Sequence, residues 1–164
     1  MTTITKENRR KFPLRLEDRD EWDVVKALNR YLLSQNYALV RANGKSWYGD
    51  TAAFSPDKKQ VSVYEVKNER ARHTEVRGAF GQALDGFIDG YISFIVIPER
   101  CLLSAQRFRA FFPVGVITYV VNDSITEFIF TTQWEGTIPS QVKEVAKGKE
   151  GCKWLRKEDV EERQ

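Results

Sequence analysis

The chain has 164 residues, and 41% of them are hydrophobic, which suits one compact domain (residues 1–164) with a buried core. The net charge of +3 permits a polyanionic partner without requiring one, and two cysteines without an apolar leader argue against a secreted disulfide scaffold. No apolar run approaches the roughly 18 to 20 residues needed to cross a bilayer, so we exclude a membrane protein and expect a cytoplasmic one.

The N-terminal half predicts a basic arm, one helix and three strands. Residues 1–15 carry five basic side chains against one acid, which we interpret as a basic arm. Apolar residues recur every three or four positions from Leu16 to Ser34, as in an amphipathic helix. Strands are then expected at Tyr37 to Arg41, Trp47 to Phe54 and Val61 to Lys67, because turn residues separate these apolar runs.

The C-terminal half continues the alternation of helices and strands. An apolar stripe predicts a second helix around Val76 to Phe87, which ends near Gly90. The remaining segments are a strand at Tyr91 to Ile97, a helix at Leu102 to Phe112, and strands at Val114 to Val121 and Glu127 to Phe130. Residues from about 140 to 164 are rich in Lys and Glu and are interpreted as a helical extension.

The third predicted strand carries the side chains of greatest chemical interest. A period of two puts Glu65 and Lys67 on the same face, about 7 Å apart along the strand. If this strand pairs with the previous one as a hairpin, Asp50 comes to lie beside Glu65. Hydrolysis of a phosphodiester needs a hard cation, and carboxylate oxygens hold such cations. Asp50 and Glu65 are therefore candidate metal ligands, with the backbone carbonyl of Val66 as a further oxygen.

A plainer interpretation of this pattern is also available. A Glu-x-Lys tripeptide arises by chance about once in a few hundred residues at average composition, so it carries little weight alone. An isolated pair of this kind is usually an ion pair on a solvated face. The context favours a site, because the acid and the base end a strongly apolar strand and Asp50 stands one strand earlier, behind Gly49.

From about residue 17 to 130 the chain resembles the PD-(D/E)XK, or restriction-endonuclease-like, nuclease superfamily, which includes Holliday junction resolvases. The order helix, Asp-bearing strand, Glu-x-Lys strand, Gln-bearing helix and apolar strand is similar. In this chain the corresponding segments are, in the same order, the helix with Glu21, Gly49-Asp50, Tyr64-Glu65-Val66-Lys67, Gly81-Gln82-Ala83 and Ile92 to Ile97. The chain departs from the family name in having Gly rather than Pro before Asp50.

The resemblance implies an α/β fold in which helices flank a central mixed sheet of about five strands, in αβββαβ order. It implies an endonuclease that hydrolyses DNA with Mg²⁺ or Mn²⁺, with Asp50 and Glu65 as metal ligands and Lys67 as the catalytic base. Cutting two strands would be simplest for a symmetric homodimer, and Phe108, Phe111 and Phe112 are either its interface or core.

Glu21 and Gln82 complete the expected catalytic set. The resemblance makes Glu21 a fourth residue of the site, because it lies on the core face of its helix, although the same position suits an acid that stabilises the helix dipole. Gln82 borders small residues on a helix with several glycines, each internal one costing about 1 kcal/mol. A close approach of another group to this helix would compensate for the cost of its glycines. That group is either the sheet alone or a nucleic-acid backbone near Gln82.

A basic segment follows the Glu-x-Lys strand. Arg70, Arg72, His73 and Arg77 are interpreted as phosphate-contacting residues beside the scissile strand, although His73 also suits an ordinary exposed histidine. Trp47 and Tyr48 either stack on bases or belong to the core.

Three functions remain in competition on the sequence alone. The first is the DNA endonuclease, and the second is a catalytically inactive nuclease-fold module for DNA binding or assembly. The third, a domain that binds a small anion, is weaker because no Gly-rich phosphate loop follows any strand.

Overall fold

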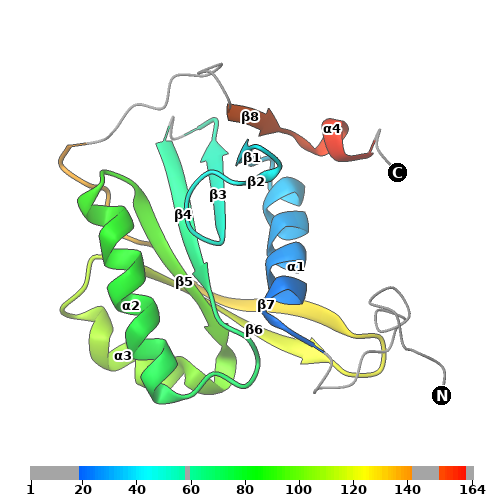
Figure 1. The fold of residues 1–164 in the computed structure, drawn as a ribbon. Coiled ribbons are helices and arrows are strands. Elements are labelled where there is room, and N and C mark those ends of the chain that lie inside the picture. Colours follow the sequence, from blue (N-terminus) through cyan, green and yellow to red (C-terminus); the bar gives the residue numbers. More distant parts are fainter. Residues whose placement is uncertain (1–18, 58–59, 142–151, 162–164) are drawn as a thin grey trace.

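The computed structural model describes residues 19–57, 60–141 and 152–161, and within them the chain is an α/β structure with an open mixed sheet (Figure 1). The basic arm and the expected first residues of the first helix lie outside these ranges. None of the helices in the described ranges has the length and apolarity needed to cross a bilayer.

The first half begins with α1 (Glu21–Ser34), whose N-cap is Asp20. The Asp20 side chain accepts a hydrogen bond from the Asp23 amide, and the Asp23 side chain accepts one from the Asp20 amide, so the helix start is fixed from both directions. The strands that follow are β1 (Ala38–Ala42), β2 (Lys45–Ser46), β3 (Thr51–Ser55) and β4 (Gln60–Val66).

The second half packs around a strand that is buried along its whole length, β5 (Ile92–Pro98). The other elements are α2 (His73–Ile88), the 3-10 helix η3 (Glu99–Cys101), α3 (Leu102–Arg109), β6 (Gly115–Asn122), β7 (Glu127–Trp134), β8 (Cys152–Leu155) and α4 (Lys157–Glu161).

Parallel pairing is confined to the centre of the sheet. In the described residues the sheet has eight strands in the order β2-β1-β3-β4-β5-β6-β7, with β8 also paired to β1. The β4–β5 and β5–β6 pairs are parallel, and the other pairs are antiparallel. Parallel strands need cover on both faces, which explains why β5 has no exposed residue.

Helices cover the two faces of the sheet (Figure 1). On one face α1 packs against Tyr64 and Val66 of β4, and on the other α2 and α3 pack against Ile95 and Ile97 of β5. Val61 and Val63 belong to a separate apolar cluster with Tyr91. The predicted period of two along β4 is therefore confirmed.

The expected element order is confirmed, but the number of strands and the C-terminal helix are wrong. The described sheet has eight strands instead of about five: β6 and β7 match two segments expected as strands, whereas β2 and β8 were not expected. Residues 152–155 form a strand beside β1, and the short α4 follows it. Trp154 packs edge-on against Phe54, with 4.6 Å between ring centroids, so tertiary contact outweighs the helical preference of a Lys- and Glu-rich segment. Residues 142–151 and 162–164 of that expected extension lie outside the described ranges.

Several segments start or end at residues other than those expected: α1 begins at Glu21, and β7 continues past Phe130 to Trp134. The strand expected from Trp47 begins at Thr51, because residues 47–50 form bends that lead into β3. The helix expected to end at Phe112 ends at Arg109. Phe108 and Phe112 pack against the core, whereas Phe111 is 82% exposed.

The glycines of α2 allow a matched stability test. A Cβ on Gly86 would lie 2.6 Å from Ser93 Oγ and 2.7 Å from Val63 Cγ2, so Gly86→Ala should lower the free energy of unfolding by about 1–3 kcal/mol. Gly81 has nothing within 4 Å, so Gly81→Ala should raise it by about 0.5–1 kcal/mol. Urea titrations of both variants measure the difference. Equal effects would contradict the close approach of α2 to the sheet at Gly86.

Candidate active site

The β3–β4 hairpin places Asp50 beside the end of β4. The two strands pair antiparallel with Thr51 opposite Tyr64, so Asp50 lies next to Glu65. The Asp50 amide donates to the Tyr64 carbonyl at 3.1 Å, and Asp50 Oδ2 accepts a hydrogen bond from the Val66 amide at 2.7 Å. The Asp50 carboxylate is therefore fixed beside the last residues of β4. The predicted hairpin brings Asp50 next to Glu65, as expected.

Gly49 explains why the residue before Asp50 has no side chain. Its φ is +59°, and a Cβ there would lie 3.1 Å from both Glu65 Oε1 and the Tyr64 carbonyl oxygen. Proline is restricted to φ near −65°, so it does not fit this conformation. The glycine lets the backbone pass close to Glu65 while it turns into β3.

Lys67 and Gln82 meet across the space between the sheet and α2. Lys67 follows β4 directly, and its amide donates to the Val96 carbonyl at 2.9 Å. Lys67 Nζ donates to Gln82 Oε1 at 3.1 Å. Gln82 lies on α2 in the position expected from the sequence, and it gives the ammonium group a fixed direction.

Glu21 joins this group from the opposite layer. It is the first residue of α1 and is partly buried. Burial raises the pKa of its carboxyl, the nearby charge of Asp50 and a hydrogen bond to Asp50 raise it further, and Lys67 opposes the shift. Glu21 therefore lies within electrostatic reach of both Asp50 and Lys67.

The pKa of Glu65 shows how closely the acids are gathered. Burial is the largest cause of its rise to about 7, and the charge of Asp50 and a hydrogen bond to Asp50 add to it. Lys67 lowers this pKa and Glu21 raises it. Asp50 thus lies at the centre of a carboxyl cluster, defined here as Glu21, Asp50 and Glu65, with Lys67 as the neighbouring cation.

Asp50 is the shared neighbour of the other two acids in the carboxyl cluster. In the part of the chain that the structure describes, no three His, Cys, Asp or Glu side chains have the spacing of a ready metal site. The acids nevertheless lie close together, because the charge of Asp50 and a hydrogen bond to its side chain both contribute, after burial, to the raised pKa of Glu21 and of Glu65.

The basic residues predicted to contact phosphates lie beside this cluster in the sequence. Arg70, Arg72 and Arg77 are exposed, on the segment after Lys67 and on the first turns of α2. His73 is partly buried, with its Nδ1 3.0 Å from Ser104 Oγ and its ring 5.9 Å from that of Phe108. Its imidazole is held against α3, and a phosphate contact by His73 stays a prediction.

Other sequence candidates have structural roles. Trp47 and Tyr48 pack against Tyr91, with ring centroids 5.3 and 5.0 Å away, and the Tyr48 hydroxyl donates to Asp89 Oδ2 at 2.6 Å. These contacts favour the core interpretation over base stacking. Val66 is fully buried, and the part expected of its carbonyl oxygen stays a prediction.

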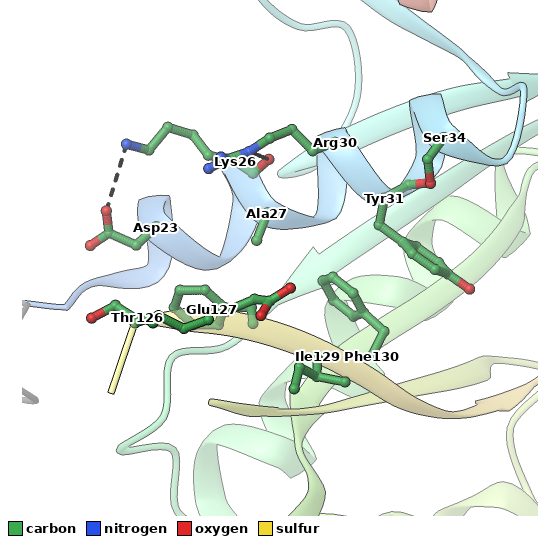
Figure 2. Close-up of a pocket in the computed structure, with 12 residues that line it drawn as sticks. Asp23, Lys26, Ala27, Arg30, Tyr31, Ser34, Thr126, Glu127, Ile129 and Phe130 are labelled. Carbon is green, nitrogen blue, oxygen red and sulfur yellow. Dashed lines mark hydrogen bonds and ion pairs between the residues drawn. The ribbon is translucent and has the colours of Figure 1, made fainter. Parts of the chain in front are cut away.

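A groove of about 790 Å³ lies elsewhere, between α1 and β7 (Figure 2). Its polar groups have ordinary partners: Lys26 pairs with Asp23 at 3.6 Å, and Arg30 Nε donates to the Lys26 carbonyl at 3.4 Å. Its apolar wall includes Tyr31 and Phe130, whose ring centroids are 4.9 Å apart. Its acid Asp23 already takes part in the N-terminal cap of α1 and pairs with Lys26, so we keep the carboxyl cluster as the candidate site.

Comparison of the chain with protein-family models and with curated proteins gave no match. The candidate site therefore rests on the geometry and electrostatics of these residues.

The raised pKa of Glu65 predicts a pH-dependent stability in the presence of a chelator. Its native pKa of about 7 exceeds the ordinary value of 4.5, so the native state keeps a proton that the unfolded chain has released. This contribution is complete below the ordinary value and is lost as pH rises through about 7. The free energy of unfolding should therefore fall between about pH 5 and pH 8, and Glu65→Gln should flatten this slope.

Urea titrations across this pH range measure the slope, with the exposed Asp57→Asn as the control. An unchanged slope in Glu65→Gln would show that the carboxyl is not held in a raised-pKa environment.

Proposed function

We propose that this protein is a metal-dependent endonuclease that hydrolyses phosphodiester bonds in DNA, on a restriction-endonuclease-like fold. The observation that carries the proposal is the convergence of Asp50, Glu65 and Lys67 at the end of one hairpin. Glu21 and Gln82 reach the same point from helices on opposite faces of the sheet. The family's expected order of site-bearing elements is present, which supports the proposal for the finer fold.

The chemistry of the carboxyl cluster suits a hard divalent cation such as Mg²⁺ or Mn²⁺. Burial and then the charge of Asp50 raise the pKa of Glu21 and Glu65, and a cation at the same place would offset this repulsion. Asp50 and Glu65 would hold the ion, with the Val66 carbonyl as a third oxygen and Glu21 as an outer acid. When bound, the ion supplies positive charge and Lewis acidity toward a phosphodiester oxygen.

Lys67 provides a second positive charge next to the cluster. Its ammonium is held by the Gln82 side chain, so it is directed before any substrate arrives. In the proposed reaction the neutral amine of Lys67 would accept the proton of the attacking water, and the ammonium that results would stabilise negative charge that develops on the phosphoryl oxygens. Gln82 keeps Lys67 in this position.

The exposed arginines support a nucleic-acid substrate. Arg70 and Arg72 lie on the segment that follows Lys67, and Arg77 lies on the first turns of α2, so a nucleic-acid backbone bound there would pass the site. Guanidinium groups bind phosphates through paired hydrogen bonds, which position the duplex without reading its sequence.

The proposed activity predicts that supercoiled DNA is nicked or linearised in Mg²⁺ and is untouched in a chelator. Asp50→Ala and Lys67→Ala should each lower the cleavage rate by about 100-fold or more, because each removes a group used in the transition state. Gel assays with supercoiled, linear, single-stranded and four-way-junction DNA measure the rate and the substrate preference.

The matched controls are Asp57→Ala, on the β3–β4 turn, and Lys45→Ala, on β2, both exposed and with the same changes of charge. Circular dichroism checks that all four variants fold. DNA binding without cleavage under every metal condition would favour the inactive nuclease-fold module instead.

A further inference from the structure

A buried arginine lies directly in front of α1. The Arg19 side chain is 5% exposed, and its Nε lies 2.8 Å from Glu69 Oε2, on a side chain that is 16% exposed. Its Nη1 donates to Asp123 Oδ1 at 2.7 Å, on the turn between β6 and β7, where the Asp123 side chain is 79% exposed. A guanidinium is expensive to bury, so this position depends on the carboxylates that it meets.

The two ends of the inner ion pair adjoin two site residues. Arg19 precedes Glu21 by two residues, and Glu69 follows Lys67 by two residues. Glu21 belongs to the helix on one face of the sheet, whereas Lys67 belongs to the segment that leaves the end of β4. One ion pair therefore links the chain segments that carry Glu21 and Lys67.

Other donors hold the segment after Lys67. The buried Tyr119 hydroxyl, from β6, donates to the Lys67 carbonyl at 2.6 Å. Arg100 donates to the Glu69 carbonyl and, at 2.7 Å, to the Ala71 carbonyl. The backbone around Lys67 is thus fixed, while the Lys67 side chain extends toward Gln82.

We propose that Arg19, Glu69 and Tyr119 are positioning residues that fix Lys67 relative to Glu21 in the active site. The inference rests on the endonuclease function proposed above. These three side chains are buried or nearly so, and they act through the backbone of the site residues. Their contribution is preorganisation, because a shift of about 1 Å between catalytic groups can cost about 100-fold in rate.

Three variants test the positioning role with little loss of packing. Arg19→Lys keeps the charge but loses the planar fork that reaches both carboxylates. Glu69→Gln removes the inner ion pair, and Tyr119→Phe keeps the ring while it removes the hydrogen bond to Lys67. Asp123→Asn is the matched control, because it alters only the exposed arm of the same arginine.

Each test variant should lower kcat by about 10- to 100-fold at saturating Mg²⁺, with little change in KM for DNA. Arg19→Lys and Glu69→Gln should also weaken Mn²⁺ binding measured by calorimetry, because Glu21 moves away from Asp50. Asp123→Asn should match the wild-type protein in all of these measurements. Rates are taken well below each Tm, where a purely structural role would leave kcat unchanged.

Folded Arg19→Lys and Glu69→Gln variants with wild-type kcat and Mn²⁺ affinity would overturn the inference. If either variant fails to fold, the kcat of Tyr119→Phe provides the test. A wild-type kcat in Tyr119→Phe would overturn the inference as well. A wild-type protein that binds Mn²⁺ but cuts no DNA would refute the proposed function alone. The Mn²⁺ affinities of Arg19→Lys and Glu69→Gln would then decide whether the positioning role holds.

Discussion

The gathering of the carboxyl groups of Glu21, Asp50 and Glu65 in a partly buried volume is the constraint on which the site depends. Burial is the largest cause of the raised pKa of Glu21 and of Glu65, and the nearby charge of Asp50 raises both further. The Val66 amide holds Asp50 in place at 2.7 Å, so the cluster cannot relax simply by turning that carboxylate away. This arrangement favours any species that brings positive charge, whether a proton, the Lys67 ammonium or a divalent cation.

The fold supplies the rigidity that this arrangement needs. The end of β4 carries the acid and the base, and its neighbour β5 is buried along its whole length. Helices on both faces add one polar residue each, Glu21 from α1 and Gln82 from α2. Gly49 allows the close backbone turn next to Glu65. The site thus combines four separate segments, and the sheet core holds their spacing.

The sequence predicted the parts of this site that depend on local pattern. The period of two placed Glu65 and Lys67 on one face, and turn residues predicted the hairpin that brings Asp50 to Glu65. The contact between Tyr119 and Lys67 joins residues 52 positions apart, and a tyrosine in an apolar strand gives no signal for it. The pairing of β8 with β1 was missed for a similar reason, because the composition of residues 152–155 and their surroundings suggested helix while distant partners determined the structure.

The most direct test of the account is the location of a bound ion. We expect an anomalous difference map from crystals soaked in Mn²⁺ to show a peak held by the Asp50 and Glu65 carboxylates, and we expect this peak to disappear in Asp50→Asn. A map in which Mn²⁺ binds only to other residues, or in which Asp50→Asn leaves the peak unchanged, would contradict the claim that the carboxyl cluster is a metal site.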